Sequence, residues 1–286
     1  MRFMSLFSGV GGMDLGLERA GMECVVQVES DEYARGVLAR HWPHVPRYDD
    51  VVGFPPVVEP VDLICGGPPC QPLSWAGRRK AEADERWMWD EYIRIVREVR
   101  PRWVLVENVL GLLSAGHVRG SAFGTILGDL AAAGYDAEWQ SIPAAAVGAR
   151  HIRNRVWLVA YTNSAGLEGR VFDPERTRQL LAGSRRETEQ GIWSPERRVQ
   201  RLAHGVPRRV DRIRCLGNAC VPQLVEVIGR RIMECHVAID NAASSAEGVE
   251  SEHAGALGEE GEGDEEVPSD FHGSHGRGVE GAGWGW

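Results

Sequence analysis

Short apolar segments alternate with helical segments over the first 162 residues, and this alternation restricts the chain to an α/β fold. We predict strands at Arg2–Phe7, Glu23–Glu29, Val61–Cys65, Trp103–Val106, Tyr135–Ile142 and Val156–Tyr161. We predict helices at Met13–Ala20, Asp31–His41, Asp90–Val99, Ala122–Ala133 and Cys220–Ile239. Strands that alternate with helices indicate a doubly wound sheet with parallel strands.

A glycine-rich turn, Ser8–Gly12, follows the first predicted strand. Glycines allow a tight turn and a close approach to a ligand, and the N–H groups of the following helix point at that ligand. Glu29, at the end of the next strand, could bond the hydroxyls of a ribose. The pattern F-S-G-x-G-G differs from G-x-G-x-x-G, so it does not favour a nicotinamide cofactor. Asp50 is a candidate for an adenine amino group, with a solvated turn as the alternative.

A proline-flanked cysteine, Cys70, follows the third predicted strand within the segment Gly66–Ser74. The carboxyl end of a strand is where α/β folds place ligands. The two preceding prolines fix the backbone and can present the sulfur outward. One alternative is a buried structural cysteine. Another is zinc, because Cys65/Cys70 and Cys215/Cys220 share a C-x4-C spacing, although tight zinc pairs usually have C-x2-C.

Two further segments carry charged side chains next to predicted strands. Glu107 follows an apolar strand, so its carboxyl could have a raised pKa and act as an acid. Arg153 and Arg155 lie two residues apart before another strand and point to the same side of an extended segment. They could hold a phosphate or a carbonyl. The alternative is two arginines facing solvent at an edge.

These motifs occur in a particular order. F-S-G-x-G-G is followed by G-P-P-C-Q-P-x-S, E-N-V and R-x-R, and then by the final segment Gly217–Pro222. Over residues 3–232 the chain therefore resembles the C5-cytosine DNA methyltransferase family, with the closest likeness to small bacterial and phage enzymes. The stretch Leu202–Pro207 adds to this likeness. The sequence departs from the family pattern at Arg150, where proline is frequent, and at Cys220, where valine is common.

The resemblance implies a Rossmann-like, S-adenosylmethionine-dependent enzyme with S-adenosylhomocysteine as product. It implies that Cys70 adds to C6 of a cytosine flipped out of duplex DNA, that Glu107 bonds N3, that Arg155 holds O2 and that Arg153 positions the backbone. Cofactor contacts are implied for Phe7, Ser8, Gly9, Gly11, Gly12, Glu29, Asp50, Pro68, Asn218 and Ala219. DNA contacts are expected for Gln71, Ser74, Arg78, Arg79, Lys80, Arg176, Arg178, Arg185 and Arg186.

The charge is unevenly distributed. The net charge is −9, but residues 237–286 carry −11 and the rest of the chain +2. The acidic end is rich in Gly, Ser, Ala and Glu, so we predict that it is disordered. Residues 160–214 hold twelve arginines and seven acids, a composition suited to phosphates and guanine edges. We therefore expect a catalytic domain at 1–162, a small target-recognition region at 163–200, the final motifs and C-terminal helix at 201–239, and a disordered tail at 240–286.

The composition also bears on location and partners. No apolar stretch is long enough to cross a bilayer, the N-terminus is a poor signal peptide, and six cysteines fit a reducing compartment. We expect a cytoplasmic, nucleoid-associated bacterial monomer that binds double-stranded DNA without a metal, with a cognate restriction endonuclease acting separately. The alternatives are methylation of cytosine in transfer RNA, a non-catalytic DNA-binding homologue, and a nicotinamide oxidoreductase.

Overall fold

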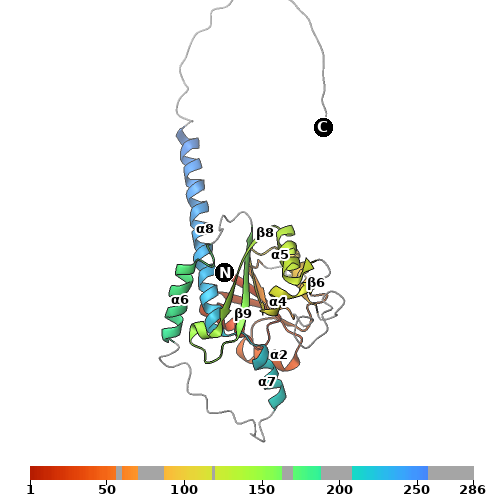
Figure 1. Cartoon of the computed structure of the whole chain (residues 1–286). Coiled ribbons are helices and arrows are strands. Elements are labelled where there is room, and N and C mark those ends of the chain that lie inside the picture. The colour runs from red at the N-terminus through yellow and green to blue at the C-terminus, as the bar shows by residue number, and fades with distance from the viewer. Residues whose placement is uncertain (56–59, 70–86, 118–119, 163–169, 188–207, 257–286) are drawn as a thin grey trace, which may run out of the picture. The chain divides into compact units, whose positions relative to one another are not determined.

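The computed structural model describes residues 1–55, 60–69, 87–117, 120–162, 170–187 and 208–256, and the chain divides into two units, Met1–Asp240 and Asn241–Trp286. The first unit is built on a seven-stranded sheet with the order β3-β2-β1-β4-β5-β9-β8 (Figure 1). These strands are β1 (Arg2–Leu6), β2 (Glu23–Val28), β3 (Arg47–Tyr48), β4 (Leu63–Gly66), β5 (Trp103–Val109), β8 (Tyr135–Pro143) and β9 (Asn154–Thr162). A separate two-stranded ladder pairs β6 (Gly116–His117) with β7 (Gly120–Ser121).

Helices cover both faces of the sheet, which confirms the doubly wound α/β prediction. They are α1 (Gly12–Arg19), α2 (Glu32–His41), α3 (Trp89–Val99), α4 (Gly111–Ser114), α5 (Ala122–Ala132), α6 (Pro174–Glu187), α7 (Arg209–Asn218), α8 (Pro222–Ala256) and the 3-10 helix η1 (Ala144–Val147). One buried cluster joins the sheet to α3 and α5, and a second joins it to α1, η1 and α8. Figure 1 shows α5 and α8 on opposite sides of the sheet.

The alternation of side chains along each strand explains these two cores. Ile64 faces the α3–α5 core, whereas its neighbours Leu63 and Cys65 face the α1–α8 core. Val104 and Leu105 divide in the same way on β5. Strands that are buried on both faces have continuous apolar sequences instead of alternating apolar and polar residues. The segments of this sheet could therefore be recognised as strands although they lack that alternation.

The prediction of an all-parallel sheet is wrong for one strand. β1 through β5 pair in parallel, but β9 pairs antiparallel with both β5 and β8. A run of apolar residues reads the same in either direction, so periodicity could not reveal the reversal. The reversal matters because the start of β9 lies beside the end of β5, where Arg155 pairs with Val109.

Local signals placed several element ends correctly. The Asp31 side chain accepts a hydrogen bond from the Ala34 N–H (2.9 Å), as an N-cap residue does, and Gly21 has a φ of 92° after α1. The C-terminal helix is longer than predicted. α8 continues to Ala256, so the start of the 240–286 segment is helical and the prediction of disorder is wrong for it. Residues 257–286 lie outside the described residues.

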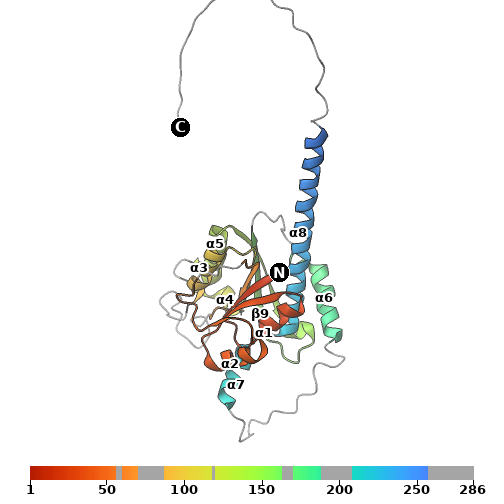
Figure 2. The ribbon, with the colours of Figure 1, turned by 180° about the vertical axis from the view of Figure 1, so that it is seen from behind.

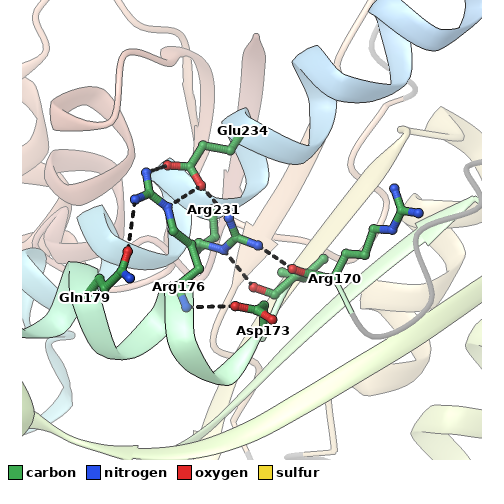
Figure 3. Close-up of polar contacts among 7 residues, drawn as sticks. Arg170, Asp173, Arg176, Gln179, Arg231 and Glu234 are labelled. Atoms are coloured by element: carbon green, nitrogen blue, oxygen red, sulfur yellow. Dashed lines mark hydrogen bonds and ion pairs between the residues drawn. The ribbon is translucent and has the colours of Figure 1, made fainter.

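The segment assigned to target recognition, 163–200, is described only over 170–187. Its helix α6 is held against α8 by an ion-pair network (Figure 3). Arg176 pairs with Glu234 of α8, with 3.1 Å between Arg176 Nε and Glu234 Oε2. The buried Arg231 pairs with the same Glu234 and donates to the backbone carbonyls of Arg170 and Val171, at 3.1 Å for Val171. This part of the region therefore packs on α8.

Candidate active site

The polar residues singled out from the sequence meet at one edge of the sheet. β1, β2, β4 and β5 are parallel, so their carboxyl ends lie at a common edge. The glycine turn follows β1, Glu29 follows β2, Gly67 and Pro68 follow β4, and Glu107 lies near the end of β5. Antiparallel β9 brings its first residues to the same edge.

Glu107 and Arg155 form the centre of this site. Arg155 Nε lies 3.0 Å from Glu107 Oε1, and the Glu107 residue is only 8% exposed. Gly67 leaves room beside the carboxyl group, because a Cβ on Gly67 would lie 3.2 Å from Glu107 Oε2. The structure thus brings together Glu107 and Arg155, which the sequence places 48 positions apart.

The environment of Glu107 shifts the pKa of its carboxyl group above the usual value. Burial raises the pKa of Glu107, while the positive charges of Arg155 and then Arg153 oppose that rise. Burial also lowers the pKa of Arg153, and the neighbouring Arg155 adds to this effect. A buried carboxyl beside two guanidinium groups can donate a proton or a hydrogen bond to a bound base.

The turn after β4 is fixed to β5 through Asn108. Asn108 Nδ2 donates to the Pro68 carbonyl oxygen (3.2 Å), and Asn108 Oδ1 accepts from the Val109 N–H (2.8 Å). Both Pro68 and Asn108 are buried. Asn108 was not selected from the sequence as a site residue, although it lies inside the E-N-V motif. Cys70, Gln71, Ser74, Arg78, Arg79 and Lys80 lie outside the described residues.

The glycine turn is strained and open. Phe7, Gly9 and Gly11 have φ values of 54°, 56° and 82°, and a Cβ on Gly9 would meet no atom within 4 Å. Ser8 is buried, and its hydroxyl donates to the Ser5 carbonyl oxygen (3.0 Å). Positive φ at the non-glycine Phe7 costs about 1–3 kcal/mol and persists only where surrounding structure holds it. The surrounding structure therefore holds the turn in a fixed conformation that is open at Gly9.

Glu29 lies across this turn. Its Oε2 accepts from the Gly9 N–H (2.7 Å) and its Oε1 from the Asp31 N–H (2.8 Å). Two backbone donors fix the carboxylate, which keeps further acceptor capacity for hydroxyl groups. Asp50 is exposed two residues beyond β3, and its Oδ1 accepts from the Val52 N–H (2.9 Å). An open glycine cradle with a fixed carboxylate beside it fits an adenosyl group.

The final motif closes the other side of the cradle. Gly12 packs so tightly against the backbone of Cys220 that a Cβ on Gly12 would lie 2.7 Å from the Cys220 carbonyl oxygen. Asn218 ends α7, and Ala219 is its C-cap. Arg153 Nη1 donates to the Gly217 carbonyl oxygen (2.7 Å), which ties the segment before β9 to the final motif. Widely separated motifs are thus joined by direct contacts.

Asp14 is a buried acid that sequence reasoning missed. It lies on α1 below the glycine turn, where it accepts hydrogen bonds from Ser5 Oγ (3.0 Å), Gln27 Nε2 (2.8 Å) and Cys24 Sγ (3.6 Å). Burial raises the pKa of Asp14 above its usual value, and the three hydrogen bonds oppose that rise. The signal available in the sequence was its place next to Met13 and three residues before Leu17, on the apolar side of the helix.

A cavity of about 620 Å³ opens between α1, the segment before β9 and the start of α8. Its lining includes Arg19, His151, Arg153, Leu216 and Gln223. Arg153 Nε and Gln223 Oε1 are buried polar atoms without a hydrogen-bond partner among the described residues. Such atoms are uncommon in folded proteins and often mark a place where a ligand or water belongs.

The four arginines of α6 expected to contact DNA are all exposed, but two have carboxylate partners. Arg176 pairs with Glu234, and Arg178 pairs with Glu175 at 2.8 Å. Arg185 and Arg186 lie in the last turn of the helix. Among the residues that the structure describes, no group of three or more His, Cys, Asp or Glu side chains could hold a metal ion, and no helix is long and apolar enough to span a membrane.

Curated relatives named Type II methyltransferases match more than half of this chain. The Type II methyltransferase M.HgiCII of Herpetosiphon aurantiacus is 34% identical over 170 residues, which cover 58% of this chain and 38% of the relative. M.HhaI of Haemophilus parahaemolyticus is 30% identical over 173 residues, 60% of this chain and 52% of the relative. M.AquIA of Picosynechococcus is 34% identical over 177 residues, 55% of this chain and 71% of the relative. The chain thus spans about half or less of the length of the first two.

A solved structure and a family model agree with these relatives. The crystal structure of a protein described as a DNA modification methyltransferase encoded within an E. coli prophage matches 59% of this chain and covers 48% of that protein, with a TM-score of 0.50 and 30% identity. The model of the C-5 cytosine-specific DNA methylase family matches residues 1–196. With its motifs gathered at one edge of a Rossmann-like sheet, this chain belongs to the C-5 cytosine-specific DNA methylase family.

Proposed function

We propose that this protein is a DNA (cytosine-5-)-methyltransferase that modifies a cytosine within a short sequence of duplex DNA. The observation that carries the proposal is the buried Glu107–Arg155 pair beside Gly67 and Pro68. A carboxyl with a raised pKa can bond N3 of a cytosine, and a guanidinium next to it can bond O2. The family match to residues 1–196 supports the same chemistry.

The proposed nucleophile is Cys70. The thiolate is the reactive form of cysteine, and burial raises the pKa of each of the five described cysteines, which disfavours their thiolates. Cys70, the sixth cysteine, directly follows the turn that Asn108 holds beside Glu107. Its thiolate adds to C6 of the cytosine while Glu107 bonds N3, and C5 then becomes nucleophilic. After C5 gains the methyl group, loss of the C5 proton releases the thiol.

The proposed cofactor is S-adenosylmethionine, which supplies the methyl group when bound. Phe7, Ser8, Gly9, Gly11 and Gly12 would form its cradle, and Glu29 would bond the ribose hydroxyls. Asp50 would bond the adenine amino group. Pro68, Asn218 and Ala219 would border its methionine end. The open space at Gly9 and the two backbone donors that fix Glu29 support this assignment.

We propose duplex DNA as the partner, bound in part by Gln71, Ser74, Arg78, Arg79 and Lys80, and by exposed arginines of α6. Phosphates are bound preferentially by guanidinium and ammonium groups. We also propose that the protein acts as a cytoplasmic monomer and that any cognate restriction endonuclease is a separate protein. The relatives named Type II methyltransferases support a restriction-modification or phage setting.

Bisulfite sequencing of DNA from cells that express the protein tests the proposal. Cytosines protected in one short sequence context, with the wild type and not with Cys70→Ser, are expected. Both proteins should bind S-adenosylhomocysteine in calorimetry, which shows that the variant is folded. Protection of transfer RNA cytosines with unmodified DNA would instead establish RNA as the substrate. Protection of neither by a protein that binds the cofactor would identify a non-catalytic homologue.

A further inference from the structure

Four large apolar side chains lie exposed on α7 and on the segment that precedes β9 and Arg155. Ile152 is 73% exposed, and Val210, Ile213 and Leu216 of α7 are 79%, 59% and 72% exposed. We call these four residues the apolar ridge. The three on α7 are spaced three residues apart and share one side of the helix. Clustered exposed apolar side chains mark interaction surfaces, whereas single ones need no explanation.

The segment that carries Ile152 is joined to α7 through Arg153. Arg153, the next residue, donates to the Gly217 carbonyl oxygen at the end of α7 (2.7 Å). His151 and Arg153 also line the same cavity as Leu216. The segment before β9 and the end of α7 are therefore neighbours, and Arg155, two residues after Arg153, contacts Glu107.

The orientation of α7 is fixed from its other side. Cys215 is the one buried residue of this helix. Arg214 pairs with Asp31, and the Arg208 guanidinium lies 5.8 Å from the centre of the Tyr33 ring. Figure 2 shows α7 beside α2, the helix that Asp31 caps and that carries Tyr33. Because this side faces α2, the exposed side chains of Val210 and Ile213 lie on the side of α7 away from α2, and Leu216 lies beside the cavity.

The segment that carries Ile152 is also held firmly. The Ile152 carbonyl oxygen accepts from the Ala144 N–H (2.8 Å), and Arg153 has a φ of 26°. A non-glycine residue in this region is strained, and such strain clusters at functional sites. The backbone thus presents Ile152 to solvent three residues before Arg155, which contacts Glu107.

The charges around the ridge point to DNA. Arg150 and Arg212 are exposed, and Arg153 lies between Ile152 and Arg155 in the sequence. The single acid of α7, Asp211, is paired with Arg214 at 3.2 Å. A polyanion is attracted to such a surface, and apolar side chains can enter the groove and stand against unstacked bases. A protein partner would bury the same apolar area, but it would lack the regular negative charge that matches the arginines.

We propose that the apolar ridge contacts duplex DNA beside the target cytosine, and that Ile152 packs against the bases left unstacked when the cytosine leaves the helix. This inference rests on the proposed function. Flipping costs stacking and pairing energy, and an apolar side chain at the gap offsets part of that cost. Truncation of Ile152 should therefore lower methyl transfer more when the target cytosine is paired than when it is mismatched.

The test compares Ile152→Asp and Ile213→Asp with Val237→Asp, which alters an exposed valine (50%) of α8. Fluorescence anisotropy with a labelled duplex, in the presence of S-adenosylhomocysteine, is expected to show at least tenfold weaker binding for the two ridge variants and no change for the control. Thermal unfolding and S-adenosylhomocysteine affinity should match the wild type in all three, which separates a contact with DNA from misfolding.

A second measurement tests the role of Ile152 itself. Ile152→Ala is expected to lower kcat/KM on a paired target at least tenfold, and less than threefold when the target cytosine is mismatched. Equal losses on the two substrates would overturn the role at the flipped base. Ridge variants that bind duplex DNA as well as the wild type would overturn the DNA contact, and a change in their oligomeric state would identify a protein interface instead. A wild type that neither binds nor methylates DNA would overturn the proposed function as well.

Discussion

Glu107, the proposed acid, shows how burial and neighbouring charges act on the pKa of one carboxyl group. Burial raises its pKa, and the charges of Arg155 and Arg153 limit the rise. The protonated form is the one that donates to a bound base, so methyl transfer should weaken as the pH rises through the pKa of Glu107. Glu107→Gln should lower kcat by about 10²–10⁴-fold and remove this pH limb. Initial rates across pH check the expectation, with Glu98→Gln on the exposed side of α3 as the control. A pH limb that survives in Glu107→Gln would assign it to another group.

Asp14 offers a second test at the scale of one residue. Its pKa is raised in the folded protein, so the neutral form is favoured there. The resulting stability is fully present below the unfolded pKa and is lost as the pH rises through the folded pKa. Asp14→Asn cannot ionise and can still accept from Gln27 and Ser5. Urea unfolding should show a weaker decline of the unfolding free energy with rising pH in the variant, and parallel curves would contradict the assignment.

Motif order was sufficient to select Glu107 and Arg155, which the structure brings into contact, but contacts beyond the motifs were not accessible from it. Neither the depth of Asp14 nor the bond from Asn108 to Pro68 follows from spacing, since both depend on which strands are neighbours. Cys70 was assigned by motif alone. Tertiary position decides whether a polar side chain in a helix faces solvent or the core.

At the scale of elements, the reversed strand β9 was the main feature hidden from sequence periodicity. The alternating pattern gave six strands (β1, β2, β4, β5, β8 and β9) and most ends of the five predicted helices within a few residues, because burial on both faces leaves continuous apolar runs. It missed the two-residue strands β3, β6 and β7 and the helices α4, α6 and α7. Strand direction is set by the connection: η1 and its following segment turn the chain between β8 and β9, which therefore pair antiparallel. That reversal is what brings Arg155 to Glu107.

The attachment of α6 to α8 provides the test at this scale. Arg231 is buried and bonds Glu234 and the carbonyls of Arg170 and Val171, whereas its neighbour Arg230 pairs with Glu226 at the surface. Arg231→Met leaves buried acceptors without donors and should lower the unfolding free energy by roughly 1–3 kcal/mol. Arg230→Met should change it by about 0.5 kcal/mol or less. The midpoints of urea unfolding measure both changes, and equal shifts would show that the network adds nothing beyond a surface ion pair.

At the scale of the whole molecule, the charge of the chain is divided between its two units. The first unit, residues 1–240, carries +1 and the second, residues 241–286, carries −10, which together make −9. The buried residues that α8 adds to the core, Leu224, Val225, Val227, Ile228, Ile232 and Cys235, all precede Asp240, where the first unit ends. The fold that carries the candidate site is therefore complete before the acidic segment begins.

Deletion of residues 242–286 tests the buried core and the acidic charge separately. The deletion removes a net charge of −10 and no residue of the buried core. The melting temperature should stay within about 2 °C of the full chain, and methyl transfer should be retained. Duplex DNA should bind more tightly at low salt, with the difference fading as salt screens the charge. Anisotropy across a salt series measures this effect, with unfolding scans alongside. A truncated protein that is destabilised, or that no longer binds DNA, would show that the acidic segment is needed for folding or for binding.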